Sequence, residues 1–156
     1  AERAAVFGSG SDPFGVAHLG LQWRPKDSHF VLDVAGVPTA HVGVIRHDVL
    51  SEQSSIHVAG LGAVITAVNF RGQGHATALV QHVLGEVLES GADAALLFCL
   101  PGLVPFYRRL GFEVVTTQVL VEQPTGQIVA PFPVMVRSLT DRIWPERAVT
   151  LGSLPW

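Results

Sequence analysis

One stretch of the chain decides its fold: Asn69-Phe70-Arg71-Gly72-Gln73-Gly74-His75-Ala76-Thr77-Ala78-Leu79. A strand-like segment rich in Val, Ile, Leu and Thr, residues 60–68, precedes it. After it, apolar side chains recur at steps of three and four, which predicts an amphipathic helix. This apolar face consists of Ala76, Leu79, Val80, Val83, Leu84, Val87 and Leu88. Gly91 then suits the end of the helix.

The order of strand, glycine-rich turn and helix start predicts an anion site. Glycines let the backbone approach a ligand, the first N–H groups of a helix lack partners, and the helix dipole favours negative charge. We therefore expect a phosphate or pyrophosphate to bind here. A P-loop is excluded because His75, not Lys, follows Gly74, and the dinucleotide fingerprint fails because residue 77 is Thr.

A second informative stretch begins about thirty residues later. Residues 93–100 predict a short buried strand that ends at Pro101-Gly102. A short helix should follow in Val104-Pro105-Phe106-Tyr107-Arg108-Arg109-Leu110-Gly111-Phe112. Pro105 suits its first turn, the two arginines suit its last turn, and Gly111 suits the position just past its end.

Two motifs in these stretches resemble signatures of the GCN5-related N-acetyltransferase (GNAT) superfamily. One is Arg-x-x-Gly-x-Ala, carried by Arg71, Gly74 and Ala76, and the other is Phe-Tyr-x-x-x-Gly-Phe from Phe106. The order of the two motifs, their spacing, and their positions after strand-like segments are also similar to those in the superfamily. The resemblance implies an α/β GNAT fold, with a mixed, mostly antiparallel central sheet flanked by helices. It also implies acetyl-CoA as co-substrate and direct attack by a primary amine in a ternary complex.

The resemblance also assigns site residues. The pyrophosphate of CoA should be held by the backbone of Arg71, Gly72, Gln73, Gly74, His75 and Ala76. Val64, Ile65 and Thr66 should lie beside the pantetheine and acetyl group. Tyr107 aligns with the general acid of the family, and a phenol of pKa near 10 can protonate a thiolate of pKa near 8.5 without ionising early. Cys99 should only pack, and His75, His82, Arg108 and Arg109 should lie on solvated helix faces.

Composition limits the function further. The 156 residues are 48% hydrophobic and 15% charged, so we expect a single globular domain over residues 1–156. No apolar run approaches the roughly 18 residues of a membrane span. A net charge of −3 and a pI near 6.1 argue against a nucleic-acid partner. The single cysteine fits the cytoplasm, and no cluster has the spacing of metal ligands.

Within the superfamily the chain is similar to two branches. The aminoglycoside 2′-N-acetyltransferases have a similar strand, loop and helix-borne tyrosine, and they end in a tryptophan like Trp156. The nodulation N-acyltransferases resemble it through Arg24-Pro25, residues 36–43, Leu61-Gly62 and Trp144-Pro145. Both imply a small sugar-like or polycationic amine as acceptor, and both are compatible with a homodimer. Trp156 with its carboxylate, Asp12 and Glu122 lie in segments that resemble the acceptor side.

The chain also departs from these branches. The aminoglycoside enzymes have a glutamate that helps to deprotonate the amine, and the corresponding residue here is Gly62. His41, His47 and His57 are alternative bases by pKa alone. The resemblance does not extend to the family's first strand and most of its first helix, so we expect a fragment or a shortened relative. Two alternative functions therefore stand: an N-acyltransferase with a longer acyl donor on an amino sugar, and a non-catalytic CoA-binding protein.

The remaining segments predict mostly strands. Residues 29–34 and 39–46 should form a hairpin that turns at 35–38, and residues 56–68 should form a long strand. A second hairpin should join 112–121 to 128–136 through a turn at 123–126. The tail, 140–156, should wrap the surface. A helix end is expected at 1–7, and loops are expected at 8–15 and 48–54.

Overall fold

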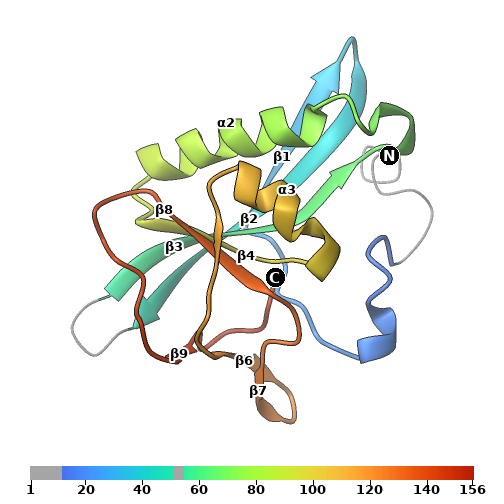
Figure 1. The fold of residues 1–156 in the computed structure, drawn as a ribbon. Coiled ribbons are helices and arrows are strands. Elements are labelled where there is room, and N and C mark those ends of the chain that lie inside the picture. The colour runs from blue at the N-terminus through green and yellow to red at the C-terminus, as the bar shows by residue number, and fades with distance from the viewer. Residues whose placement is uncertain (1–11, 51–54) are drawn as a thin grey trace.

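The computed structural model describes residues 12–50 and 55–156. Its main sheet has six strands in the order β1-β2-β3-β4-β8-β5 (Figure 1). These strands are β1 (Ser28–Val34), β2 (Val37–Leu50), β3 (Ser55–Thr66), β4 (Ala94–Phe98), β8 (Val134–Ser138) and β5 (Glu113–Val114). Only β3 and β4 are parallel, and the other neighbours are antiparallel. The predicted mixed, mostly antiparallel α/β fold is confirmed.

The first hairpin and the long strand form as predicted. The β1–β2 turn consists of Ala35 and Gly36, and the Asp33 carboxylate accepts a 2.6 Å hydrogen bond from the Gly36 N–H. Strand β2 begins at Val37, earlier than expected, because a register irregularity at Leu32/Asp33 accommodates Pro38 within the pairing. Strand β3 ends at Thr66, just before the predicted end.

The amphipathic helix is α2 (His75–Glu89), and it covers one face of the sheet. Its buried residues are Leu79, Val80, Val83, Leu84 and Val87. Leu88 was expected on the same face but is 44% exposed, because it lies about 100° around the helix from Val87, beyond the apolar stripe. The helix ends at Ser90, and Gly91 takes the left-handed position after it.

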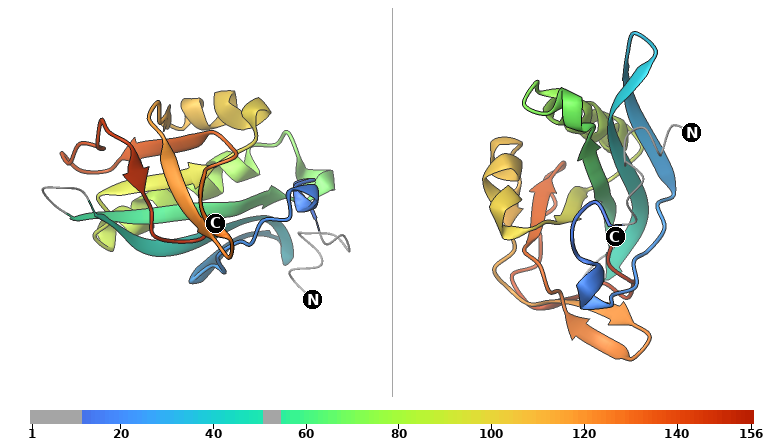
Figure 2. Two further views of the ribbon diagram at one scale, coloured as in Figure 1. Left: turned by 90° about the horizontal axis from the view of Figure 1, so that it is seen from below. Right: turned by 90° about the vertical axis from the view of Figure 1, so that its right-hand side faces the viewer.

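Strand β4 shows that both faces of the sheet are buried. Ala95, Leu97 and Cys99 pack with α2 and with α3 (Val104–Arg109), whereas Ala94 and Leu96 pack on the opposite face. There a small sheet covers the main one, with β6 (Val119–Gln123) between β7 (Gly126–Val129) and β9 (Val149–Thr150). Figure 2 shows the helices and the β6–β7 hairpin on opposite sides of the main sheet.

The predicted second hairpin forms in a single register around its predicted turn, but its two ends lie in different sheets. Strand β5 pairs with β8 in the main sheet, whereas β6 pairs with β7 in the small sheet, with Pro124 and Thr125 in the turn. Apolar alternation indicates a strand but not the sheet that it joins, so the break between β5 and β6 within residues 112–121 was not predicted.

The tail runs over the surface through residue 148, as predicted, but from Val149 onward it is partly buried, which was not predicted. Strand β9 pairs in parallel with β6, and Leu151 and Trp156 are 2% and 4% exposed. The Trp156 indole N–H donates to the Leu96 carbonyl at 3.3 Å, and its ring lies edge-on to Phe98 at 5.2 Å. Gly60 leaves room for this ring, because a Cβ there would lie 2.3 Å from it.

Some expectations fall outside the described residues: the helix end at 1–7 and parts of the loops at 8–15 and 48–54. Among the helices that the structure describes, none combines the length and apolar character needed to cross a membrane.

Candidate active site

Strands β3 and β4 part in the middle of the sheet. They pair only from Val58 with Ala94 to Leu61 with Leu97. Strand β4 then ends at Phe98, and the Cys99 N–H turns to the Pro133 carbonyl at 3.1 Å, whereas β3 continues to Thr66. A cavity of about 730 Å³ opens beside the parted strands, lined by the segment before β1, the middle of β3, the end of β4, and α3.

A bulge shapes β3 at this point. Gly43 pairs with Gly62 and His41 with Ile65, so Ala63 and Val64 together face one residue of β2. Ala63 has φ 49°, a left-handed conformation that costs a non-glycine residue about 1–2 kcal/mol. The His41 side chain, 3% exposed, bonds the Ala63 carbonyl through Nδ1 at 2.7 Å and His29 through Nε2 at 2.9 Å. His41 therefore stabilises the bulge.

The turn after β3 presents the start of α2. It runs through η2 (Val68–Phe70) to Gly72 and Gly74, which have φ 76° and 82°. Gly74 is the N-cap residue and no side chain caps the helix, so its first N–H groups point outward without a side-chain acceptor. The Arg71 Nε donates to the Thr66 carbonyl at 3.3 Å, and the Gln73 amide donates to the Asn69 carbonyl at 3.1 Å.

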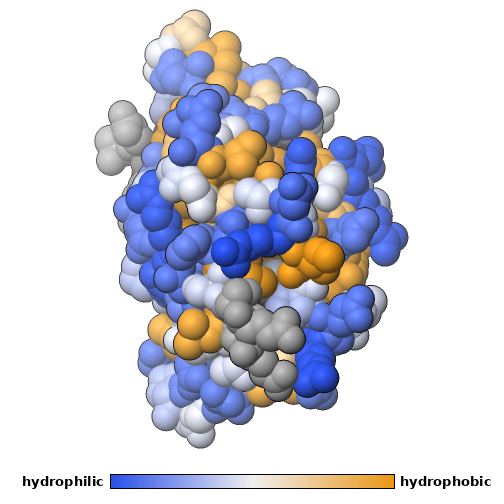
Figure 3. Space-filling model, turned by 90° about the vertical axis from the view of Figure 1, so that its left-hand side faces the viewer, coloured by the Kyte–Doolittle hydropathy of each residue, from blue (hydrophilic) through white to orange (hydrophobic). Residues whose placement is uncertain are grey.

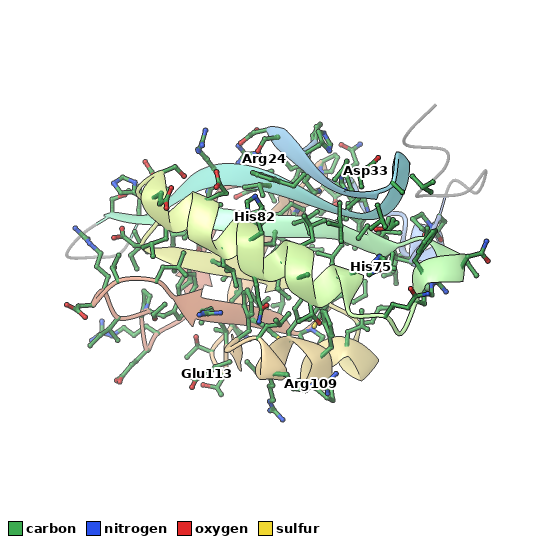
Figure 4. The ribbon with its side chains drawn as sticks, turned by 90° about the horizontal axis from the view of Figure 1, so that it is seen from above. Arg24, Asp33, His75, His82, Arg109 and Glu113 are labelled. Atoms are coloured by element: carbon green, nitrogen blue, oxygen red, sulfur yellow. The ribbon has the colours of Figure 1, made fainter. Side chains whose placement is uncertain are left out.

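The helix histidines and arginines only partly match expectation (Figure 4). His75, at the first turn of α2, is half-buried rather than solvated, because its ring stacks on Phe70 at 5.6 Å. His82 is exposed and meets the Phe30 ring edge at 6.3 Å. Arg108 and Arg109 are exposed on α3, as predicted.

Tyr107 reaches the cavity from α3. Its ring is 5% exposed and lies edge-on to Phe106 and Phe112. Burial, and next the neighbouring Cys99, raise the pKa of the Tyr107 phenol above its usual value. Burial also raises the pKa of Cys99 to about 11, and its Sγ lies 3.7 Å from the Met135 sulfur. Both groups keep their protons at neutral pH, so Cys99 is a poor nucleophile.

The structure brings several of the predicted site residues together. Asp12, Val64, Tyr107 and Trp156 all line the cavity. The Asp12 carboxylate accepts the Ala17 and Val16 N–H groups at 2.7 and 3.0 Å, ahead of η1 (Ala17–Leu19), and these bonds lower its pKa.

Other predicted residues stand apart from the cavity. Ile65 is 8% exposed and packs in β3, and Thr66 accepts the Arg71 bond. Glu122 is not among the cavity residues: it lies on β6 and accepts a 2.8 Å bond from Gln127.

Sequence reasoning missed Lys26, which also lines the cavity. Burial, and next the charge of Arg24, lower the pKa of Lys26 to about 8. Lys26 belongs to no motif of the sequence. No local signal marks it, because the two glycines that its side chain crosses, Gly43 and Gly62, are distant in sequence.

The three histidines considered as bases lie outside the cavity lining. His41 holds the bulge, and His47 bonds the Leu151 carbonyl and Arg24. His57 bonds Asp48 at 2.6 Å beside a smaller hollow of about 320 Å³ at the other end of the sheet. Figure 3 shows that end as mainly hydrophilic, with separate apolar patches. Among the described residues, no three His, Cys, Asp or Glu side chains could share a metal ion.

Solved structures share this fold. A GNAT family N-acetyltransferase (YhbS) from Escherichia coli, in complex with CoA, has 21% identity and a TM-score of 0.63 over 96% of this chain and 80% of that one. For the ribosomal-protein-S18-alanine N-acetyltransferase of E. coli the identity is 15% and the TM-score 0.55, over 92% and 88%. A probable N-acyltransferase from Enterococcus faecalis V583 has 22% identity and a TM-score of 0.51 over 55% of this chain. This chain spans only 21% of that protein's length.

The sequence comparisons agree with the fold. No curated protein matches the chain. The model of the acetyltransferase (GNAT) domain matches residues 23–115, more than half of the chain. The predicted superfamily is therefore confirmed, and the chain belongs to the GNAT acetyltransferase domain family.

Proposed function

We propose that this protein is an acetyl-CoA-dependent N-acetyltransferase that acts on a primary amine of a small molecule. One observation carries the proposal: the cavity opens where β3 leaves β4, and it contains both the open strand edge and the Tyr107 side chain. The uncapped start of α2 follows the end of the same strand. A thioester and an amine could therefore meet beside a proton donor.

Acetyl-CoA fits the groups that these elements leave without partners. The outward N–H groups of residues 72–76 and the dipole of α2 suit the pyrophosphate. Beyond Leu61, the edge of β3 that faces away from β2 pairs with no strand in the part of the chain that the structure describes, so its backbone can bond the amide groups of the pantetheine arm. Val64, Ile65 and Thr66 lie on this part of β3.

The proposed reaction is a direct transfer. The amine attacks the thioester carbonyl, a C–N bond forms, the C–S bond breaks, and the amine loses a proton. The Tyr107 O–H, protonated at neutral pH, donates to the departing sulfur. An acyl-enzyme is not needed, because Cys99 keeps its proton and packs against Met135.

The charge of the cavity bears on the acceptor. Among the described residues that line it, Asp12 and Lys26 have the acidic and basic side chains, and most others are apolar or aromatic. An amine with one apolar face suits this lining better than an aminoglycoside with many charges, although an amino sugar with few charges also fits. The apolar lining near Leu100, Leu103 and Phe132 favours a longer acyl donor as the second candidate.

A paired screen tests the function. Release of the CoA thiol and the mass of the product would be measured with aromatic amines, amino sugars, aminoglycosides and polyamines, using acetyl-CoA and a medium-chain acyl-CoA as donors. We expect an N-acetylated product and the fastest turnover for amines with an apolar body. Faster turnover with the longer donor would favour the second candidate. Binding of acetyl-CoA without turnover of any amine would favour a non-catalytic protein and contradict the proposal.

A further inference from the structure

An N-acetyltransferase must remove a proton from its acceptor, because only a neutral amine attacks a thioester. Strand β3 carries no carboxylate between Ser55 and Thr66, and its residue at the parting point is Gly62. The three histidines near this strand lie outside the cavity lining. A side chain that accepts this proton must therefore come from another element.

Lys26 crosses the place where a side chain at residue 62 would project. A Cβ at Gly43 would lie 2.5 Å from Lys26 Cγ, and a Cβ at Gly62 would lie 2.6 Å from Cε and 3.2 Å from Nζ. The absence of a side chain at both glycines thus leaves a groove, in which the Lys26 side chain crosses β2 and β3. The Lys26 amino group therefore lies beside the β3 bulge, in the wall of the cavity.

The surroundings of this amine favour its neutral form. Nζ donates to the Arg24 carbonyl at 3.2 Å, and across residues 12–50 and 55–156 no ion pair joins Lys26 to a carboxylate. Burial and Arg24 lower the pKa of Lys26 to about 8. A charged group is expensive to bury without a partner, so the site favours loss of the proton.

The sequence adds an independent observation. Lys26 is the only lysine in the sequence, and the other nine residues of the Lys and Arg total are arginines. Arginine keeps its proton at all ordinary pH values and cannot act as a base, whereas a buried lysine can. This one lysine is also the only Lys or Arg among the described residues that line the cavity.

We propose that Lys26 is the general base of the transfer, a role that rests on the function proposed above. The neutral Lys26 Nζ takes a proton from the acceptor ammonium. The neutral nitrogen then attacks the acetyl carbonyl carbon and releases its second proton to solvent. The C–S bond then breaks and the thiolate leaves with a proton from Tyr107. The Lys26 ammonium releases its proton to solvent, and Tyr107 takes one back, which restores both groups.

The pH dependence follows from the groups that face Lys26. Asp12, Cys99 and Tyr107 line the same cavity, and Arg24 lies two residues before Lys26 on the chain. The carboxylate carbon of Trp156 lies 3.0 Å from the Cβ position of Gly62, so its negative charge also faces this region and opposes the effect of burial on the pKa of Lys26. The pKa of Asp12 is lowered and those of Cys99 and Tyr107 are raised, so these three do not titrate near pH 8. Turnover should therefore rise with pH along a limb centred near 8.

Two substitutions test whether Lys26 acts as a proton acceptor or only supplies a positive charge. Lys26→Arg keeps the charge but cannot accept a proton, and Lys26→Met loses both, while Arg108→Met on the exposed face of α3 is the control. We expect both Lys26 variants to lose kcat by about 10²- to 10⁴-fold and to lose the limb near pH 8. Their thermal stabilisation by acetyl-CoA should match that of the wild type, as should the activity of Arg108→Met.

Because there is one lysine, its titration can be observed directly. Reductive ¹³C-methylation would give one lysine NMR signal besides that of the chain's α-amino group, and Lys26→Arg would identify it. A pKa near 8 supports the proposal, and a pKa above 10 would overturn it. Retained turnover in Lys26→Arg alone would show that the charge, not the lone pair, is needed. Acetylation of Lys26 in peptide maps after acetyl-CoA treatment would make it an acceptor instead, which also overturns the proposal.

If the wild type neither binds nor consumes acetyl-CoA, the proposed function fails. If the wild type turns over and both Lys26 variants keep more than about a third of its kcat, only the base assignment fails. Thermal shifts measured alongside turnover therefore distinguish the two failures.

Discussion

At the scale of single residues, Tyr107 and Cys99 show how burial assigns roles to groups that differ little in reactivity. Both lie beside the parted strands, and burial raises the pKa of each. A raised pKa makes a thiol a poor nucleophile, but it leaves a phenol able to donate a hydrogen bond or a proton. The same apolar surroundings thus argue against a covalent intermediate and for a proton donor.

Tyr107→Phe should reduce turnover by about 10²- to 10⁴-fold, because only the hydroxyl is removed. The ring keeps its edge-on contacts with Phe106 and Phe112, so the fold and the affinity for acetyl-CoA should change little. Steady-state kinetics combined with acetyl-CoA thermal shifts would check this. A variant that keeps more than about a third of wild-type kcat would make Tyr107 a packing residue.

The residue scale is also where sequence reasoning is weakest. Tyr107 was identified because it belongs to a local motif, and its neighbours in sequence place it on a helix. Lys26 belongs to no motif, and its position depends on glycines 17 and 36 residues away along the chain. Contacts between distant segments leave no periodic pattern, so Lys26 could be found only in the folded chain.

At the scale of elements, α2 presents its uncapped start because Gly72 and Gly74 take conformations with positive φ. Most side chains are strained there, and asparagine is among the least affected. Gly74→Asp and Gly74→Asn therefore form a matched pair: similar in shape, but only aspartate adds a negative charge where a phosphate should bind.

Gly74→Asp should abolish stabilisation by acetyl-CoA, whereas Gly74→Asn should keep much of it. Ligand binding contributes about 2.7 kcal/mol at 100 times Kd, so the difference in melting temperature is measurable. Equal thermal shifts for the wild type and Gly74→Asp would contradict the assignment of this loop to the pyrophosphate. Equal losses in both variants would indicate that strain, not charge, is responsible.

Elements were predictable where local chemistry fixes them. The helices end as the glycines at 91 and 111 indicate, and the first hairpin turns where Gly36 allows it. The pairing and the turn of the second hairpin were predicted, but its division between two sheets was not, because alternation along 112–121 does not indicate which sheet each part joins. The bulge at Ala63 was also not predicted, since its support comes from His41 on the neighbouring strand.

At the scale of the whole molecule, the last residue of the described chain connects core and cavity. Trp156 packs between Gly60 and Phe98 on the face away from α2, and it also lines the cavity. The sequence indicated a role in acceptor binding through an exposed tail. The buried ring gives Trp156 a role in stability as well, so substitution should affect the fold before it affects the acceptor.

Trp156→Ala should lower the stability by about 3–5 kcal/mol, because it empties a buried aromatic site and leaves the Leu96 carbonyl without the indole N–H. For a chain of this size the melting temperature should fall by roughly 6–20 °C. Ile143→Ala is the control, because its side chain is 82% exposed in the same tail and should shift stability by less than about 0.5 kcal/mol. Trp156→Phe should recover part of the loss, since it keeps an aromatic ring against Phe98. If Trp156→Ala melts within about 2 °C of the wild type and only the KM for the amine rises, the ring serves the acceptor alone, and the opposite face of the sheet must be stabilised without it.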